Sequence, residues 1–136
     1  MYVPVLDASC PDPEGKFDGQ YGQLDALDLL TGKVLWRQRH TLPEASSILA
    51  TAGGLVVDSS FDRSLRISDS ATGKVLWETK LDNAPKSTPV TYTANGRQYI
   101  AVVAGGSLQN APIWAFQGPT KSETLWILTV PPGAKH

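Results

Sequence analysis

Residue types that could support hydrolysis lie close together within the first 50 positions. His40 is followed by Ser46 and Ser47, and aspartates occur throughout the chain. In a hydrolytic triad a histidine takes the proton of an attacking serine and an aspartate orients the histidine. No Gly-x-Ser-x-Gly elbow is present to hold such a serine beside its base. We therefore expect His40 to be a solvated residue at a strand end, and ester hydrolysis is kept only as an alternative function.

Other common reactive sites have no motif in the sequence. Cys10 is the single cysteine, which excludes an intrachain disulfide and a cysteine metal cluster. No spacing of His, Asp and Glu resembles a zinc site, and no glycine-rich loop leads into a helix to hold phosphate. The residues by themselves therefore predict no catalytic group and no metal ligand.

The composition is that of an ordinary globular domain. The 136 residues are 41% hydrophobic and 18% charged, with a formal net charge of −1. A charge this close to zero argues against nucleic acid or an anionic membrane as a partner, because either calls for a basic face. No apolar run approaches the roughly 20 residues that span a bilayer. Residues 1–10 lack the basic and long apolar regions of a signal peptide, so we expect none in this chain.

Short apolar runs bounded by turn residues predict an all-β chain. Twelve glycines and ten prolines make turns frequent, and no segment keeps an amphipathic helical pattern over three turns. The strongest local signal is Asn95-Gly96, which predicts a hairpin between residues 89–92 and 99–103. Further strands are expected at residues 49–57, 64–68, 113–116 and 124–130.

The chain contains an internal repeat. Residues 26–36 (Ala-Leu-Asp-Leu-Leu-Thr-Gly-Lys-Val-Leu-Trp) recur as residues 67–77 (Ile-Ser-Asp-Ser-Ala-Thr-Gly-Lys-Val-Leu-Trp), 41 positions later. A period of roughly 40–45 residues is typical of one four-stranded β-propeller blade. We therefore predict a partial propeller over residues 1–130, with repeat units at about 22–62 and 63–117, and a loose tail over 131–136.

The repeated motif has a mechanical explanation. A tight reversal between two strands needs a positive φ, which Gly32 and Gly73 tolerate. The preceding aspartates can accept hydrogen bonds from turn amides. Trp36 and Trp77 then follow on the outer strand, where each ring can bury against the next blade with its N–H on a backbone carbonyl. We therefore expect the tryptophans to act as staples between blades.

Several motifs together resemble the pyrroloquinoline quinone (PQQ) dehydrogenases. The double Asp-x-x-Thr-Gly-Lys-x-x-Trp signature is similar to the tryptophan-docking motif of that family. Residues 50–56 (Ala-Thr-Ala-Gly-Gly-Leu-Val) resemble its "TAGGLVF" strand, and residues 88–102 resemble its "PVTY…GxQYVAV" hairpin. Tyr-Val-Pro-Val at 2–5, with Cys10 following, resembles the "YVPA" strand of the alcohol and glucose enzymes. The resemblance covers roughly residues 1–117 in family order.

The resemblance implies a periplasmic propeller of about eight blades that holds PQQ, usually with calcium, in its central funnel. At 41 residues per blade, this chain would supply two to three blades from the C-terminal part. The family's catalytic base, its arginine near the quinone, its adjacent-cysteine ring and its main calcium carboxylate have no counterpart here. The expectation is an incomplete dehydrogenase segment for alcohols or sugars, which binds no cofactor alone.

Two positions are implied as cofactor contacts. Asp7 stands where relatives often carry an asparagine that hydrogen-bonds the quinone, and a turn-capping aspartate is the alternative. Glu44 lies in Pro-Glu-Ala-Ser, where methanol-oxidising relatives carry Pro-Asn-Trp, and a solvated loop glutamate is the alternative. Lys86 and Ser87 are expected on the same side of the propeller.

A partial propeller must also cover the flanks of its end blades. Bare apolar flanks and free strand edges promote association. Several copies that contact one another head to tail could close a ring, so homo-oligomerisation is expected. A non-enzymatic propeller scaffold that binds partners, and a self-assembled mini-propeller with hydrolase activity, remain alternative functions.

Overall fold

The computed structural model describes residues 1–6, 19–20, 22–42, 48–105 and 123–129. These residues form ten β-strands, and among them no helix is long and apolar enough to cross a membrane. All strand pairs are antiparallel. The all-β prediction is therefore confirmed. The predicted strand at 113–116 and the tail at 131–136 lie outside the described residues.

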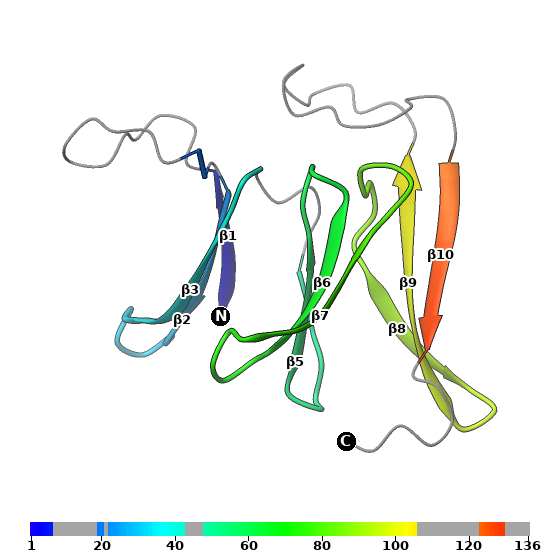
Figure 1. Ribbon diagram of the computed structural model, residues 1–136. Helices are drawn as coiled ribbons and strands as arrows, with labels where there is room; N and C mark the ends of the chain where they lie inside the picture. Colours follow the sequence, from blue (N-terminus) through cyan, green and yellow to red (C-terminus); the bar gives the residue numbers. More distant parts are fainter. Residues whose placement is uncertain (7–18, 21, 43–47, 106–122, 130–136) are drawn as a thin grey trace.

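The ten strands make three sheets that stand side by side, as Figure 1 shows. Each sheet follows chain order, so every strand pairs with the strand next to it in the sequence. The first sheet contains β1 (Tyr2–Leu6), β2 (Gly22–Leu27) and β3 (Val34–His40). The middle sheet contains β4 (Leu49–Ala50), β5 (Leu55–Ser59), β6 (Ser64–Asp69) and β7 (Val75–Lys80). The third sheet contains β8 (Val90–Ala94), β9 (Arg97–Gly105) and β10 (Glu123–Thr129).

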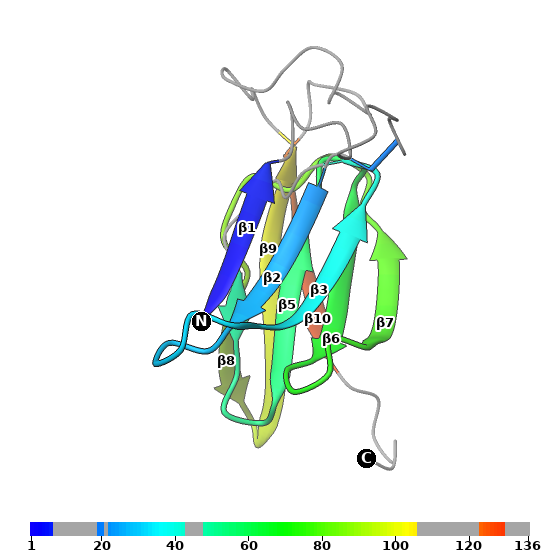
Figure 2. The same cartoon turned by 90° about the vertical axis from the view of Figure 1, so that its left-hand side faces the viewer.

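The three sheets lie face to face, one behind another, as the view turned by 90° shows (Figure 2). Four antiparallel strands in the middle sheet make one blade of the expected kind, and the first and third sheets show three strands each within the described residues. This arrangement of stacked antiparallel sheets is the β-propeller architecture that the repeat period predicts. The proposed unit limits of 22–62 and 63–117 stay a prediction.

The hairpin predicted at Asn95-Gly96 joins β8 to β9. Both residues have a positive φ, 50° at Asn95 and 72° at Gly96, as a two-residue hairpin turn with the right twist requires. Tyr92 lies opposite Tyr99 in the register, and their rings stack with centroids 5.2 Å apart. The local sequence therefore fixed this turn and its register.

An apolar core lies between the middle and third sheets. Its buried members come from β5, β6, β9 and the segment after β7: Val57, Leu65, Leu81, Val102 and Ala104. Partly buried side chains pack around them, namely Leu49, Ile67, Ile100, Trp126 and Leu128. Complete burial of a valine or leucine side chain is worth ~1.5–3 kcal/mol. This core therefore fixes the middle sheet against the third.

The contact between the first and middle sheets uses a tryptophan instead. The Trp36 Nε1–H donates to the Ser70 carbonyl at 2.9 Å. A Cβ on Gly73 would lie 2.7 Å from the Trp36 ring, so only glycine leaves room for the indole. Gln38 adds hydrogen bonds from its Nε2 to the Ser68 hydroxyl at 3.0 Å and to the Gly73 carbonyl. The predicted staple is therefore present at Trp36.

Candidate functional site

Several strands finish at the same end of the stacked sheets, which we call the loop end. In the first sheet Leu6 pairs with Gly22, and Gly22 pairs with His40, so β1 and β3 finish side by side. In the middle sheet Lys80, the last residue of β7, pairs with Ser64. The last residues of β7 and β9 lie at the same end as those of β1 and β3 (Figures 1 and 2). Residues at the ends of strands and in the loops that follow them are where a propeller carries its variable chemistry.

A polar cavity of about 430 Å³ opens at the loop end between the first and middle sheets. Its wall combines the end of β3 with β6, β7 and the turn between β5 and β6. The lining residues are Gln20, Gln38, Arg39, His40, Thr41, Asp62, Arg66, Val75 and Glu78. Arginine and carboxylate side chains both contribute, so the cavity is of mixed charge.

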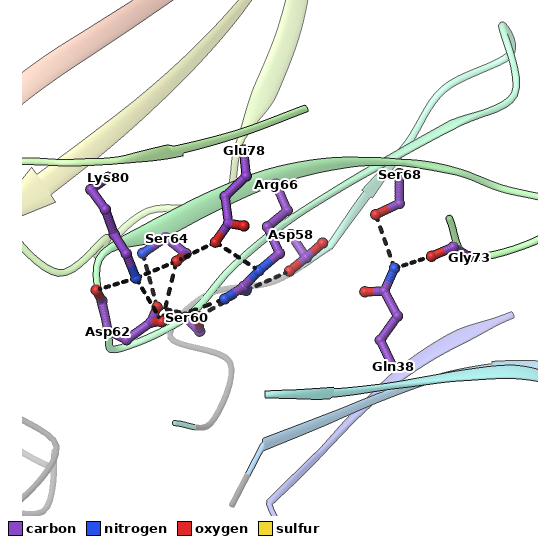
Figure 3. A network of polar contacts seen from close by, with 10 residues as sticks. All are labelled: Gln38, Asp58, Ser60, Asp62, Ser64, Arg66, Ser68, Gly73, Glu78 and Lys80. Atoms are coloured by element: carbon purple, nitrogen blue, oxygen red, sulfur yellow. Dashed lines mark hydrogen bonds and ion pairs between the residues drawn. The ribbon is translucent and has the colours of Figure 1, made fainter. Parts of the chain in front are cut away.

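Arg66 is the centre of a charged network in this wall (Figure 3). The strand registers place Asp58, Arg66 and Glu78 in one row across β5, β6 and β7. The Arg66 side chain is 7% exposed, and its nitrogens lie 3.3 Å from Asp58, 3.5 Å from Asp62 and 3.4 Å from Glu78. Its Nη1 also donates to the Ser60 hydroxyl at 2.9 Å. A buried guanidinium is tolerated only with such partners.

Asp62 fixes the turn between β5 and β6. Its carboxylate accepts hydrogen bonds from Lys80 Nζ at 2.8 Å, the Ser60 hydroxyl at 2.6 Å and the Ser64 amide at 2.9 Å. Burial by itself would raise the pKa of Asp62, but these hydrogen bonds and the Arg66 charge hold its pKa far below the ordinary value. Asp62 therefore stays ionised at any physiological pH and cannot serve as a general acid.

This network is suited to holding a turn rather than to catalysis. The Ser60 and Ser64 hydroxyls donate to carboxylates, Ser60 to Asp62 at 2.6 Å and Ser64 to Glu78 at 2.8 Å. A serine nucleophile needs a base that can remove its proton, such as a histidine or a neutral lysine. Lys80 donates to the Ser64 hydroxyl at 2.7 Å, but it is also paired with Asp62 at 2.8 Å. In the part of the chain that is described, no group of three or more His, Cys, Asp or Glu residues is placed to hold a metal ion.

The residues singled out in the sequence have different outcomes. Asp7 and Glu44 lie outside the described residues, as do Cys10, Ser46 and Ser47. Asp7 directly follows the end of β1, and Glu44 lies in the connection between β3 and β4, so both stand in sequence next to strands that meet the loop end.

His40 corrects one expectation. It was predicted to be a solvated strand end, but it is 8% exposed, because it is the last residue of β3 and packs in the cavity wall beside the middle sheet. Arg37, three residues earlier on β3, has a structural partner as well. Its guanidinium donates to both Asp25 oxygens at 2.8 Å. This pair holds the pKa of Asp25 below its usual value.

Lys86 and Ser87 have structural partners. The Lys86 Nζ lies 3.2 Å from the Glu123 carboxylate, and the Ser87 hydroxyl accepts from the Val103 amide at 2.8 Å. Sequence reasoning missed the Arg66 network altogether. Its signal was available, because Asp58 and Arg66 are charged residues inside segments that otherwise read as buried strands.

Comparisons with known proteins agree with the fold. Residues 15–100 match the PQQ family, described as the glucose/ethanol/alcohol dehydrogenase β-propeller domain. The quinoprotein alcohol dehydrogenase PedE of Pseudomonas putida is 31% identical over 85% of this chain. The quinoprotein ethanol dehydrogenase of Pseudomonas aeruginosa is 35% identical over 72% of it. A europium-containing methanol dehydrogenase superposes on 68% of the chain, with a TM-score of 0.63 and 37% identity.

The chain is much shorter than these relatives. Its matched part spans 19% of the PedE protein, 16% of the ethanol dehydrogenase and 16% of the methanol dehydrogenase structure. The family match nevertheless covers more than half of the 136 residues. This chain therefore belongs to the PQQ family, as a part of the glucose/ethanol/alcohol dehydrogenase β-propeller domain.

Proposed function

We propose that this chain is a propeller segment of a PQQ-dependent dehydrogenase that oxidises alcohols or sugars, and that it is incomplete as an enzyme on its own. The observation that carries the proposal is the family match over residues 15–100, which includes β2 and β3 of the first sheet, the whole middle sheet, and β8 with the start of β9 in the third. The matched relatives are named as alcohol, ethanol and methanol dehydrogenases.

The described residues of the loop end do not by themselves fit PQQ. This cofactor carries three carboxylates and needs unpaired cations or amide donors. Around the cavity the positive charge of Arg66 is shared by Asp58, Asp62 and Glu78, and that of Lys80 is taken by Asp62. We therefore assign no PQQ contact to this network. We keep Asp7 and Glu44 as the proposed cofactor contacts of this chain, and as carboxylates they would have to face the PQQ–calcium unit away from the carboxylates of PQQ.

The partners of the segment follow from its two flanks. We propose that further blades of a longer protein cover the first and third sheets and complete the funnel around PQQ and calcium. For the 136-residue chain alone, copies of the same chain take that place by homo-oligomerisation. The proposed compartment is the periplasm, as the resemblance implies.

A chimera tests the proposal. In it, this chain replaces the segment of the Pseudomonas aeruginosa ethanol dehydrogenase that corresponds to it, placed by an alignment that covers 72% of this chain. We expect the chimera to keep PQQ-dependent ethanol oxidation, whereas the isolated chain oxidises no ethanol with PQQ and calcium added. Asp7→Ala and Glu44→Ala in the chimera should each weaken PQQ binding, measured by titration of the apoprotein. A folded chimera that no longer binds PQQ would contradict the assignment, and oxidation by the isolated chain would contradict its incompleteness.

A further inference from the structure

Asn95 differs from the other asparagines of the chain in the residue that follows it. The sequence contains three asparagines, and Asn83 and Asn110 precede alanine, whereas Asn95 precedes Gly96. The main-chain nitrogen of the next residue can attack the side-chain amide of an asparagine and close a cyclic imide. A Cβ on that next residue crowds the attacking nitrogen, so glycine permits this reaction best. The sequence therefore singles out Asn95 for chemistry on its own side chain.

The fold leaves both reacting groups accessible. Asn95 and Gly96 are exposed, and a Cβ placed on Gly96 would meet nothing within 4 Å. Among the described residues, neither the Asn95 carboxamide nor the Gly96 amide has a hydrogen-bond partner. Asn83, in the segment between β7 and β8, is by contrast only 3% exposed. Water therefore reaches the reacting groups in the hairpin, whereas Asn83 is enclosed.

The tip of this hairpin can rotate without opening the sheet. The register of β8 with β9 ends at Ala94 opposite Arg97, so the two residues between them belong to no ladder pair. Attack on the side-chain carbon requires a rotation about the bond between the Asn95 α-carbon and its carbonyl carbon. This rotation moves the tip and leaves the ladder in place. The reaction can therefore proceed in the folded chain.

We propose that Asn95 is a site of spontaneous deamidation in the folded protein, and that its isoaspartate product breaks the register of the hairpin. The Gly96 nitrogen gives its proton to water and forms a bond to the Asn95 Cγ. The bond from Cγ to the side-chain nitrogen breaks, and ammonia leaves. Water, the only co-reactant, then opens the cyclic imide at either carbonyl carbon. One opening gives aspartate, and the other gives isoaspartate, whose main chain runs through the former side chain.

The two products have different effects on the hairpin. Aspartate followed by glycine still suits a two-residue turn of this type. Isoaspartate lengthens the main chain by one methylene, and the turn sets the register of the strands that it joins. The pair nearest to the tip with a side-chain contact is Tyr92 and Tyr99, whose rings stack with centroids 5.2 Å apart. We therefore expect the isoaspartate form to lose this stack.

The modified position is separate from the loop end. The last residues of β9 lie at the loop end, so its first residues and the hairpin tip lie at the opposite end of the sheets (Figure 1). The inference is therefore independent of the proposed dehydrogenase function.

Ageing of the purified chain at mildly alkaline pH tests the proposal, with the asparagine peptides followed by mass spectrometry. We expect the peptide that contains Asn95 to gain the mass of one deamidation and to separate into aspartate and isoaspartate forms. Its conversion should be at least about tenfold faster than that of Asn83, because an enclosed residue reacts only after local opening.

Two variants separate the chemistry from its structural consequence. Asn95→Gly keeps a suitable two-residue turn but has no amide to lose, so its melting temperature should not change on ageing. Asn95→Asp, measured fresh, should melt within about 1 °C of the parent chain. The isoaspartate form, isolated by chromatography, should melt about 2–4 °C lower, since it loses a cross-strand pair.

Two results would overturn the proposal. An Asn95 amide that lasts as long as that of Asn83 in the folded chain would exclude the site, and conversion of the same position in urea would then show that the hairpin protects it. An isoaspartate form that melts at the temperature of Asn95→Asp would show that the longer main chain leaves the register of β8 and β9 intact.

Discussion

The two copies of the repeat fold into the same turn. In the first copy the Asp28 carboxylate accepts from the amides of Leu30 at 2.8 Å and Thr31 at 3.0 Å. In the second copy Asp69 accepts from the two equivalent amides at 3.1 and 2.8 Å. The registers even shift at equivalent places, after Ala26 in one sheet and after Ile67 in the other. The shared Asp-x-x-Thr-Gly-Lys sequence has therefore produced the same local structure twice.

The surroundings of the two turns differ. The Trp36 ring lies against Gly73, whereas a Cβ on Gly32 would meet nothing within 4 Å in the described structure. Leu30 in the first turn is 97% exposed. The turn at Gly73 therefore packs against a tryptophan ring, whereas the equivalent turn at Gly32 is an open surface in the described structure. A neighbouring sheet, and not the motif, decides which of the two it becomes.

The charged pairs of the two repeats are reversed. Asp25 on β2 faces Arg37 on β3, and 41 residues later Arg66 on β6 faces Glu78 on β7. The Arg37 side chain is 48% exposed, and that of Arg66 is 7% exposed. The second pair has gained Asp58 and Asp62 as further partners. Equivalent positions therefore accept either order of charge, and among the described residues the second copy is the one that lies at the centre of a buried network.

The largest expected difference between the repeats is in the stability lost when Arg66 and Arg37 are replaced one at a time. Arg66→Met leaves the fully buried Asp58 without its cation, so we expect a loss of about 3 kcal/mol in the free energy of unfolding. Arg37→Met removes a partly solvated pair and should cost less than about 1 kcal/mol. Urea unfolding followed by circular dichroism measures both. Equal losses for the two variants would mean that burial does not separate the repeats.

A smaller contrast is expected for the two turn glycines. Both have a positive φ, 69° at Gly32 and 71° at Gly73, so alanine at either position is strained by about 1 kcal/mol. Gly73→Ala also displaces the Trp36 ring and should cost about 2–3 kcal/mol in total. Thermal unfolding of the two variants checks this difference. If Gly32→Ala lowered the free energy of unfolding as much as Gly73→Ala, a side chain would have to pack against the first turn as well.

The smallest effect concerns acid stability. The pKa of Asp62 is lower in the folded protein than its unfolded value of about 3.9. Its stabilisation is therefore present above that value, and it is lost progressively as the pH falls below about 5. We expect Asp62→Asn to flatten the acid side of the stability curve by about 1 kcal/mol. Asp25→Asn, in the more exposed pair of the first repeat, should flatten it less.

Urea unfolding at several pH values from 7 to 3 measures these two curves. An acid branch as steep in Asp62→Asn as in the parent chain would show that another carboxylate controls the acid response. Asp58 is the nearest alternative, because it is fully buried beside Arg66.

Much of the fold could be predicted because its signals are local. The Asn95-Gly96 hairpin and the two Asp-to-Gly turns depend on residues within a few positions of one another. The staple at Trp36 followed from the chemistry of an indole beside a glycine turn. The candidate site was less accessible to prediction. His40 was expected in solvent and is buried, and the Arg66 network was not foreseen, because both depend on which strands become neighbours.

The sequence by itself determined the blade period, the antiparallel strands and the geometry of each turn. It did so because hydrogen bonds across three or four residues and alternation along a strand need no distant partner. Only the tertiary structure decided that Trp36 packs against Gly73 while Trp77 is 42% exposed, that Arg66 is enclosed by three carboxylates, and that β10 is an edge strand among the described residues. These features are set by burial and by the stacking of sheets, and two nearly identical sequences acquire different environments when their neighbours differ.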